Sequence, residues 1–166
     1  MPDANTTEDL VFIDLEASGL SASSWPIEVG WASLNGLTAS YLIKPHNSWP
    51  LSAWSETAQT LHGITLEELA QKGRDCSDVC SLINAALEGK TVYSDAPDWD
   101  SFWLMRAFRA CEVKPRFFVG DFSTLFDHAP DRKTIQKADD LSPRSHRAAA
   151  DAKNLRTLYT LIKATN

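Results

Sequence analysis

The chain has 166 residues, of which 43% are hydrophobic and 23% are charged, a composition that is ordinary for a soluble globular protein of one domain. Its net charge of −6 argues against a strongly basic nucleic-acid-binding surface, and no apolar run reaches the roughly 20 residues that a membrane helix needs. The acidic N-terminus has the features of neither a secretory signal nor a transit peptide, so we expect a cytoplasmic protein with a single domain over residues 1–166, of which residues 1–9 form a flexible lead-in.

The first predicted elements are three strands. Residues 10–16 begin with a continuous apolar run that is typical of a buried strand, and residues 26–34 and 37–43 follow as the second and third strands. Asn35 and Gly36, between the last two, both tolerate positive φ, which predicts a hairpin with a type I′ turn. The chain therefore opens with an antiparallel meander.

The rest of the chain alternates between predicted helices and strands. Capping-box spacing of Thr65 and Glu68 marks one helix start, and a proline near the first turn marks another. The predicted helices lie near 51–60, from Thr65 onward, at 76–88, from Pro97 onward and at 145–163, and the predicted strands at 91–94 and 116–121. This order describes an α/β or α+β domain with a mixed sheet.

Two carboxylates, Asp14 and Glu16, end the first strand at a place where the interior begins. Residues i and i+2 of a strand point to the same face, about 6.5 Å apart, so these side chains converge. Two such anions repel each other and resist burial unless one is protonated or a cation lies between them. A pair of divalent ions about 3.5–4 Å apart would satisfy both carboxylates and would promote in-line displacement at phosphorus.

The last helix offers a third carboxylate. Leu155, Leu158 and Ile162 form an apolar stripe, and Asp151 lies four residues before Leu155 on the same stripe. Surrounding alanines would let this turn approach the sheet closely; the alternative is that Asp151 only caps the helix or pairs with an arginine. His146 precedes it by five residues, and histidine titrates near neutral pH, which suits proton abstraction, although a surface role is the alternative.

The fourth carboxylate is expected from the segment that contains Asp95, Asp98 and Asp100. Asp100 is followed by Trp103 and Leu104, an apolar pair that would hold its helix against the core. Asp98 is better explained as a favourable charge in the first helical turn, and Asp95 as a residue at the end of a strand. We therefore favour Asp100 while Asp98 and Asp95 remain alternatives.

The three cysteines, Cys76, Cys80 and Cys111, are an odd number. Cys76 and Cys80 lie four residues apart on a predicted helix, without a second cysteine pair or a nearby histidine that would complete a zinc site. We expect them to be reduced and mostly buried as small apolar residues.

Four segments together resemble a known family. Residues 12–20 resemble the first motif of the DEDDh 3′–5′ exonucleases, the DnaQ-like group within the ribonuclease H-like fold. Residues 99–104 resemble the second motif, and residues 146–151 the third, with its His-x4-Asp spacing. Residues 61–65 resemble the segment often found between the first two motifs. The four occur in the order of the family and span nearly the whole chain.

The chain departs from the family pattern in the second motif. The family commonly has a His-Asn pair five and four residues before the aspartate, whereas this chain has Asp95 and Ala96 before Asp100. A side chain that could help to order the site is therefore absent from that position.

The resemblance implies a ribonuclease H-like mixed β-sheet, with an antiparallel N-terminal meander and parallel strands, flanked by helices. It implies a metal-dependent 3′–5′ exonuclease with two divalent ions, Mg²⁺ or Mn²⁺. Asp14 would bridge both ions, Glu16 and Asp151 would complete the first site, and Asp100 would hold the second ion. His146 would be the general base that deprotonates the attacking water. The two ions would also supply the positive charge that an acidic protein needs for a phosphodiester.

The resemblance also implies a substrate site. The backbone at Ala17 and Ser18 would meet the terminal 3′ hydroxyl, Leu20 would wedge against the last bases, and Leu61 and His62 would lie near the terminal nucleotide. Placement of Leu20 and Leu61 in the core is the alternative. The partners would be single-stranded or short DNA or RNA 3′ ends, and the products would be nucleoside 5′-monophosphates. Related enzymes occur both as monomers and as homodimers, so the oligomeric state is left open.

Two other functions are compatible with the same fold. One is a catalytically silent nucleic-acid-binding or adaptor domain, which would have no reason to keep five costly polar groups in one cleft. The other is a ribonuclease H-like endonuclease or a small-molecule phosphodiesterase, against which the His-x4-Asp spacing of His146 and Asp151 favours the exonuclease.

Overall fold

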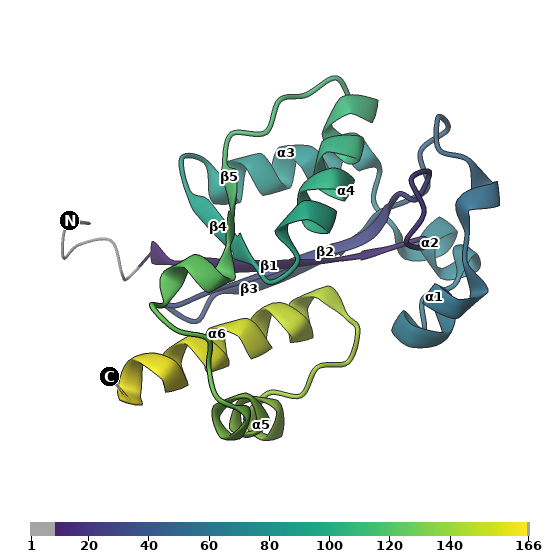
Figure 1. Cartoon of the computed structure of the whole chain (residues 1–166). Coiled ribbons are helices and arrows are strands. Elements are labelled where there is room, and N and C mark those ends of the chain that lie inside the picture. Colours follow the sequence, from purple (N-terminus) through teal and green to yellow (C-terminus); the bar gives the residue numbers. More distant parts are fainter. Residues whose placement is uncertain (1–8, 166) are drawn as a thin grey trace.

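The computed structural model describes residues 9–165, which form a five-stranded mixed sheet with helices on both faces (Figure 1). The strands are β1 (Val11–Ala17), β2 (Pro26–Ser33), β3 (Thr38–Leu42), β4 (Thr91–Ser94) and β5 (Phe118–Asp121). The helices are α1 (Glu56–His62), α2 (Leu66–Lys72), α3 (Cys76–Leu87), α4 (Pro97–Ala110), α5 (Arg132–Leu141) and α6 (Ala148–Thr165), with 3-10 turns η2 (Leu51–Ala53) and η3 (Phe122–Leu125). Most of the predicted lead-in, residues 1–8, lies outside the described residues.

The sheet has the strand order β3-β2-β1-β4-β5. β1 pairs antiparallel with β2, and β2 with β3, whereas β4 is parallel to both β1 and β5. The predicted α/β class, with an antiparallel meander followed by parallel strands, is therefore confirmed. In the described part of the chain, no helix is both long enough and apolar enough to cross a membrane.

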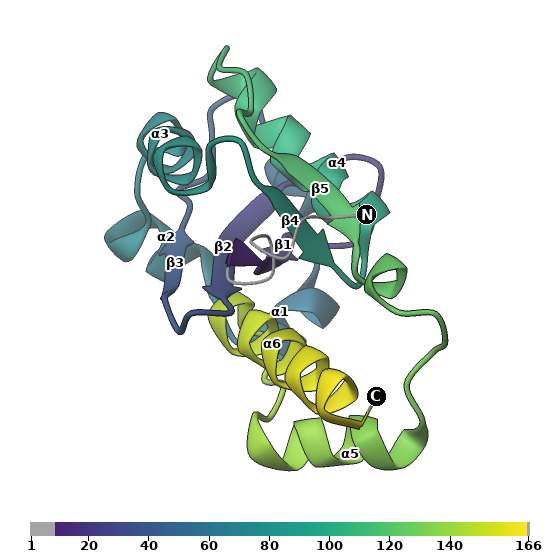
Figure 2. The same cartoon turned by 90° about the vertical axis from the view of Figure 1, so that its left-hand side faces the viewer.

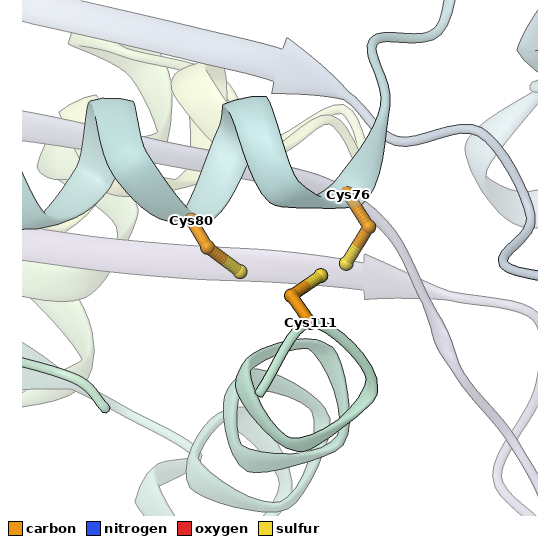
Figure 3. A group of neighbouring side chains, drawn as sticks. All are labelled: Cys76, Cys80 and Cys111. Atoms are coloured by element: carbon orange, nitrogen blue, oxygen red, sulfur yellow. The ribbon is translucent and has the colours of Figure 1, made fainter. Parts of the chain in front are cut away.

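The two faces of the sheet carry different helices. Helices α3 and α4 cover one face, and α6 lies across the other with α5 packed beside it (Figures 1 and 2). The three cysteines lie where α3 meets the end of α4, and all three are free, as the sequence predicted (Figure 3).

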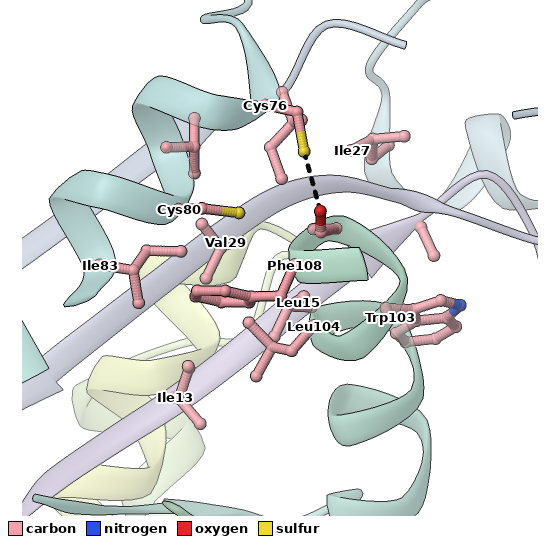
Figure 4. Close-up of a cluster of buried hydrophobic side chains, with 14 of the residues drawn as sticks. Ile13, Leu15, Ile27, Val29, Cys76, Cys80, Ile83, Trp103, Leu104 and Phe108 are labelled. Carbon is pink, nitrogen blue, oxygen red and sulfur yellow. Dashed lines mark hydrogen bonds between the residues drawn. The ribbon is translucent and has the colours of Figure 1, made fainter. Parts of the chain in front are cut away.

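The larger apolar core lies between the sheet and the α3–α4 layer (Figure 4). Val11, Ile13 and Leu15 of β1 point into this core, while Phe12 points to the other face, where it packs with residues of α6. Because side chains alternate along a strand, Asp14 and Glu16 share the face of Phe12. The alternation of β1 therefore aims both carboxylates at α6.

Helix α6 approaches β2 closely at Gly30, the residue that pairs with Asp14 across the sheet. A Cβ atom on Gly30 would lie 2.5 Å from the backbone nitrogen of Ala149 and 2.6 Å from the carbonyl carbon of Ala148. Both of these neighbours are backbone atoms, so a rotamer change of a nearby side chain could not make room for the Cβ. The alanines that were predicted to let the last helix approach the sheet therefore pack against a glycine of β2.

Substitution Gly30→Ala should displace α6 and destabilise the fold. We expect the free energy of unfolding to fall by about 1–3 kcal/mol, the usual cost of overpacking a filled core, in urea unfolding. Ser81→Ala, on an exposed position of α3, is the control and should leave the free energy of unfolding within about 0.5 kcal/mol of wild type. Equal stability of wild type and Gly30→Ala would show that α6 is not held at this distance.

Three predicted details were wrong. The hairpin is not type I′: Gly36 alone has positive φ, its N–H donates to Ser33 O, and Ser33 N–H donates to Leu37 O. These bonds make a three-residue loop with glycine at the left-handed position. The helix predicted near 51–60 is divided into η2 and α1, with Ser55 between them as the N-cap of α1.

The last helix begins at Ala148 and not near 145, because His146 has a φ of 53°, which no right-handed helix can contain. Helix α5 was not predicted at all, although Asp131 caps its N-terminus by accepting from Thr134 N–H.

Candidate active site

Three carboxylates converge between β1 and α6. One oxygen from each of Asp14, Glu16 and Asp151 lies within 4.8 Å of the other two. Asp151 is only 5% exposed, and its Oδ1 accepts a hydrogen bond of 3.0 Å from Ser145 N–H. The structure thus brings together three predicted site residues that come from opposite ends of the chain.

The electrostatics of this cluster are unfavourable without a cation. Burial, and then the charges of Asp100 and Glu16, raise the pKa of Asp14 well above its ordinary value. Burial, followed by the charge of Asp151, raises the pKa of Glu16 to about 8. Oδ2 of Asp14 is buried without a hydrogen-bond partner. An all-oxygen donor set with an unpartnered buried atom fits a hard divalent cation such as Mg²⁺ or Mn²⁺.

Asp100 is the fourth carboxylate that the geometry favours. It is 2% exposed in the first turn of α4, and Ser94 Oγ donates a 2.6 Å hydrogen bond to its Oδ2. Burial raises its pKa to about 7, and its charge acts on Asp14, although it lies outside the three-residue cluster. Of the alternatives, Asp95 pairs with Arg144 at 2.6 Å and Asp98 is exposed.

These raised pKa values predict that the metal-free protein loses stability as the pH rises. The folded state holds protons on Glu16 and Asp100 up to pKa values of about 8 and 7, whereas the unfolded chain releases them near pH 4. The folded state therefore binds more protons across this window, and the stability present at pH 5 is lost toward pH 9. In EDTA we expect the free energy of unfolding to fall by at least about 1.4 kcal/mol, and excess Mg²⁺ to offset that fall.

Urea unfolding at a series of pH values, with EDTA and with Mg²⁺, measures this linkage. Stability that stays constant or increases from pH 5 to 9 in EDTA would contradict the carboxylate cluster as described.

An ion pair between a buried glutamate and a half-buried arginine fixes the turn that carries His146. Glu28 of β2 is 3% exposed, and its Oε2 accepts a 2.7 Å bond from an Arg147 Nη. Its Oε1 accepts a 2.7 Å bond from Ala148 N–H, so the same carboxylate caps α6. His146, directly before this pair, is exposed, and its positive φ is a conformation that few residues other than glycine adopt. Sequence reasoning missed Glu28, although an acid in an apolar strand was a detectable signal.

A pocket of ≈ 280 Å³ opens beside the carboxylates and is lined by Glu16, Leu20, Leu61, His62 and His146, among others. Leu20 is 72% exposed and Leu61 58% exposed, so neither lies in the core. His62 is buried, and its Nδ1 accepts a 3.0 Å bond from Ile64 N–H. Its buried Nε2 has no partner, and burial lowers the pKa of the imidazole.

Ala17 also lines this pocket, whereas Ser18 is fully buried behind it. The N–H of Ser18 donates to Trp25 O, and its carbonyl accepts from Ser55 N–H. Ser18 therefore offers no exposed atom to a ligand in this structure, and Ala17 is the residue of the pair that borders the pocket. Ser94, at the end of β4, and Ser145 are further neighbours of the carboxylates that the sequence did not reveal, because a single serine at a strand end or in a loop carries no periodic signal.

The strand order and the mixed pairing, with helices on both faces, define a ribonuclease H-like α/β fold. Among solved structures, the zinc-bound form of an E. coli exonuclease I complex with single-stranded DNA shares this fold. The match covers 96% of this chain and 41% of that chain, with a TM-score of 0.73 and 14% identity. E. coli exonuclease I in complex with a dA16 oligonucleotide matches 95% of this chain and 41% of its own, with a TM-score of 0.72 and 14% identity.

The chain thus spans about two fifths of the length of these neighbours, and at 14% identity the likeness establishes the fold. No protein-family model matches the chain, and no curated protein matches it.

Proposed function

We propose that this protein is a divalent-metal-dependent 3′–5′ exonuclease that acts on single-stranded or short nucleic acid and releases nucleoside 5′-monophosphates. The observation that carries the proposal is the cluster of Asp14, Glu16 and Asp151, with its unpartnered buried oxygen, next to an open pocket. The fold supports it, because neighbours with this fold are exonuclease I complexes with single-stranded DNA.

The carboxylates would hold two divalent ions. Asp14, on which the charges of the other three acids act, would hold the ions together with Glu16 and Asp151 of the cluster and with Asp100 at the start of α4. Such ions, when bound, supply Lewis acidity at the scissile phosphate. Ser94 and Ser145 orient two of these carboxylates through the hydrogen bonds described above.

His146 would accept the proton of the attacking water. It lines the same pocket as Glu16, and its exposed position leaves the imidazole free to approach a substrate. The Glu28–Arg147 ion pair and the hydrogen bond from Ala148 N–H to Glu28 fix the two residues that follow His146. The backbone of this turn therefore needs little reordering before the imidazole can act.

The pocket would take the terminal nucleotide. Leu20 and Leu61 are exposed apolar side chains at its edge, suited to contact with a base. His62 Nε2 carries the imidazole proton, because Nδ1 is an acceptor. This nitrogen is buried without a partner, so it would donate to a sugar or phosphate oxygen only after a rearrangement that exposes it. The backbone at Ala17, with Ser18 behind it, would form the floor that meets the 3′ hydroxyl.

Matched 5′-labelled single-stranded DNA and RNA oligomers, with Mg²⁺ or Mn²⁺ against EDTA, test the proposal. We expect a metal-dependent ladder that shortens from the 3′ end, and the preferred oligomer identifies the substrate class. A folded protein that binds both oligomers and cleaves neither would instead be a catalytically silent binding domain.

A further inference from the structure

A second cluster of metal-ligand residues lies on the other side of the sheet. Cys76 is the first residue of α3, Cys80 follows one turn later, and Cys111 is the C-cap of α4. The three sulfur atoms lie within 4.8 Å of one another and point into one space between the two helices (Figure 3). The residues converge although 31 positions or more separate Cys111 from the other two in the chain.

This spacing is close to that of a three-sulfur metal site. Sulfurs that surround one ion in a plane at about 2.3 Å would lie about 4.0 Å from each other, so that small side-chain rotations bring the triad into range. The end of α4 fixes Cys111, because Val113 N–H donates to Phe108 O and Cys111 N–H donates to Ala107 O. The same Ala107 carbonyl accepts from Cys76 Sγ at 3.5 Å, which holds both cysteines at one point.

The surroundings select a soft ion. Among the described residues, no histidine or carboxylate joins the three sulfurs in the cluster. Apolar side chains such as Ile27, Val29 and Phe108 pack around it (Figure 4). Cys80 is fully buried, whereas Cys111 is half-buried, so that one member of the triad is in contact with solvent. Zinc prefers four ligands in tetrahedral geometry, and hard ions prefer oxygen, whereas thiolates without further ligands suit Cu(I).

We propose that Cys76, Cys80 and Cys111 bind one soft, thiophilic metal ion, of the class of Cu(I), through three sulfurs. Each sulfur that binds as a thiolate releases its proton to solvent, and no oxidation state changes. The ion would join the start of α3 to the end of α4. It would lie about 16 Å along α4 from Asp100, at 1.5 Å per residue, so that this site is separate from the carboxylate cluster.

The test is a competition titration on the full chain, reduced and free of oxygen, with Cu(I) presented on a chromogenic Cu(I) chelator. We expect wild type to take one Cu(I) per chain, with a sulfur-to-copper charge-transfer band and three sulfur neighbours in X-ray absorption. Cys111→Ser should weaken the affinity by more than about 10- to 100-fold, the loss that an outer-shell change already causes. Ser77→Ala, an exposed neighbour on α3, should bind as wild type does.

Cys111→Ser is the variant of choice because this half-buried residue tolerates a hydroxyl better than the buried pair, and circular dichroism checks its fold. If it fails to fold, the X-ray absorption of wild type decides by the number of sulfur neighbours. Binding of Cu(I) by wild type no tighter than by folded Cys111→Ser, or copper with fewer than three sulfur neighbours, would overturn the proposal. Preference for Zn²⁺ over Cu(I) would overturn it as well.

Discussion

Asp14→Asn should abolish nuclease activity and at the same time stabilise the metal-free protein. Asn keeps the shape of the side chain but removes the carboxyl group, whose pKa is raised by burial and by the charges of Asp100 and Glu16. We expect the rate to fall by at least about 10³-fold, equivalent to about 4 kcal/mol of lost transition-state stabilisation. Without metal, the free energy of unfolding should rise by about 1 kcal/mol, because one buried like charge has been removed.

The matched control is Asp98→Asn, which makes the same chemical change on an exposed residue of α4. It should leave the rate within experimental error of wild type, and it should lower the free energy of unfolding by no more than the roughly 0.3–1 kcal/mol that a charge in the first helical turn contributes. Metal-dependent cleavage measured beside urea unfolding in EDTA gives both readouts for the two variants. A variant Asp14→Asn that is destabilised but active would show that Asp14 is structural.

His146→Asn should reduce the rate by about 10²- to 10⁴-fold, the contribution of a positioned general base. Asn tolerates the positive φ of this position, so the turn before α6 should keep its conformation. Because the imidazole is exposed and does not belong to the carboxylate cluster, we expect unchanged stability and unchanged Mn²⁺ affinity.

His128→Asn, another exposed histidine, is the control and should cleave at the wild-type rate. Rates at saturating metal, together with Mn²⁺ binding followed by electron paramagnetic resonance, separate the two possible roles of His146. A loss of Mn²⁺ affinity in His146→Asn would make this residue a metal ligand, and an unchanged rate would remove it from the reaction.

The framework of the fold could be predicted because its signals are local. The apolar run of β1, the Thr65 cap and Pro97 all act within a few residues, and strand β4 and helix α3 lie where the sequence placed them. The turn type predicted at Asn35 and Gly36 was wrong, because the type of a hairpin depends on the pairing of both strands and not only on the residues at its tip. Helix α5 has few apolar residues, so periodicity gave it little signal.

The candidate site was predictable where a carboxylate interrupts an apolar pattern. Asp14, Glu16 and Asp151 each do so, and the structure brings all three together. Glu28 does the same in β2 and was overlooked, because no motif drew attention to it. The triad of cysteines was not predictable, since the residue that completes Cys76 and Cys80 comes from the end of another helix.

One measurement tests the central claim most directly: a linear 5′-labelled single-stranded oligonucleotide and its circularised form, incubated with wild type and Mn²⁺. An exonuclease that holds a 3′ end in the pocket beside Asp14 and His146 should degrade the linear strand stepwise to nucleoside 5′-monophosphates and leave the circle intact. Cleavage of the circle would mean an endonuclease, and survival of both strands in the presence of a folded, metal-loaded protein would contradict a nuclease of either kind.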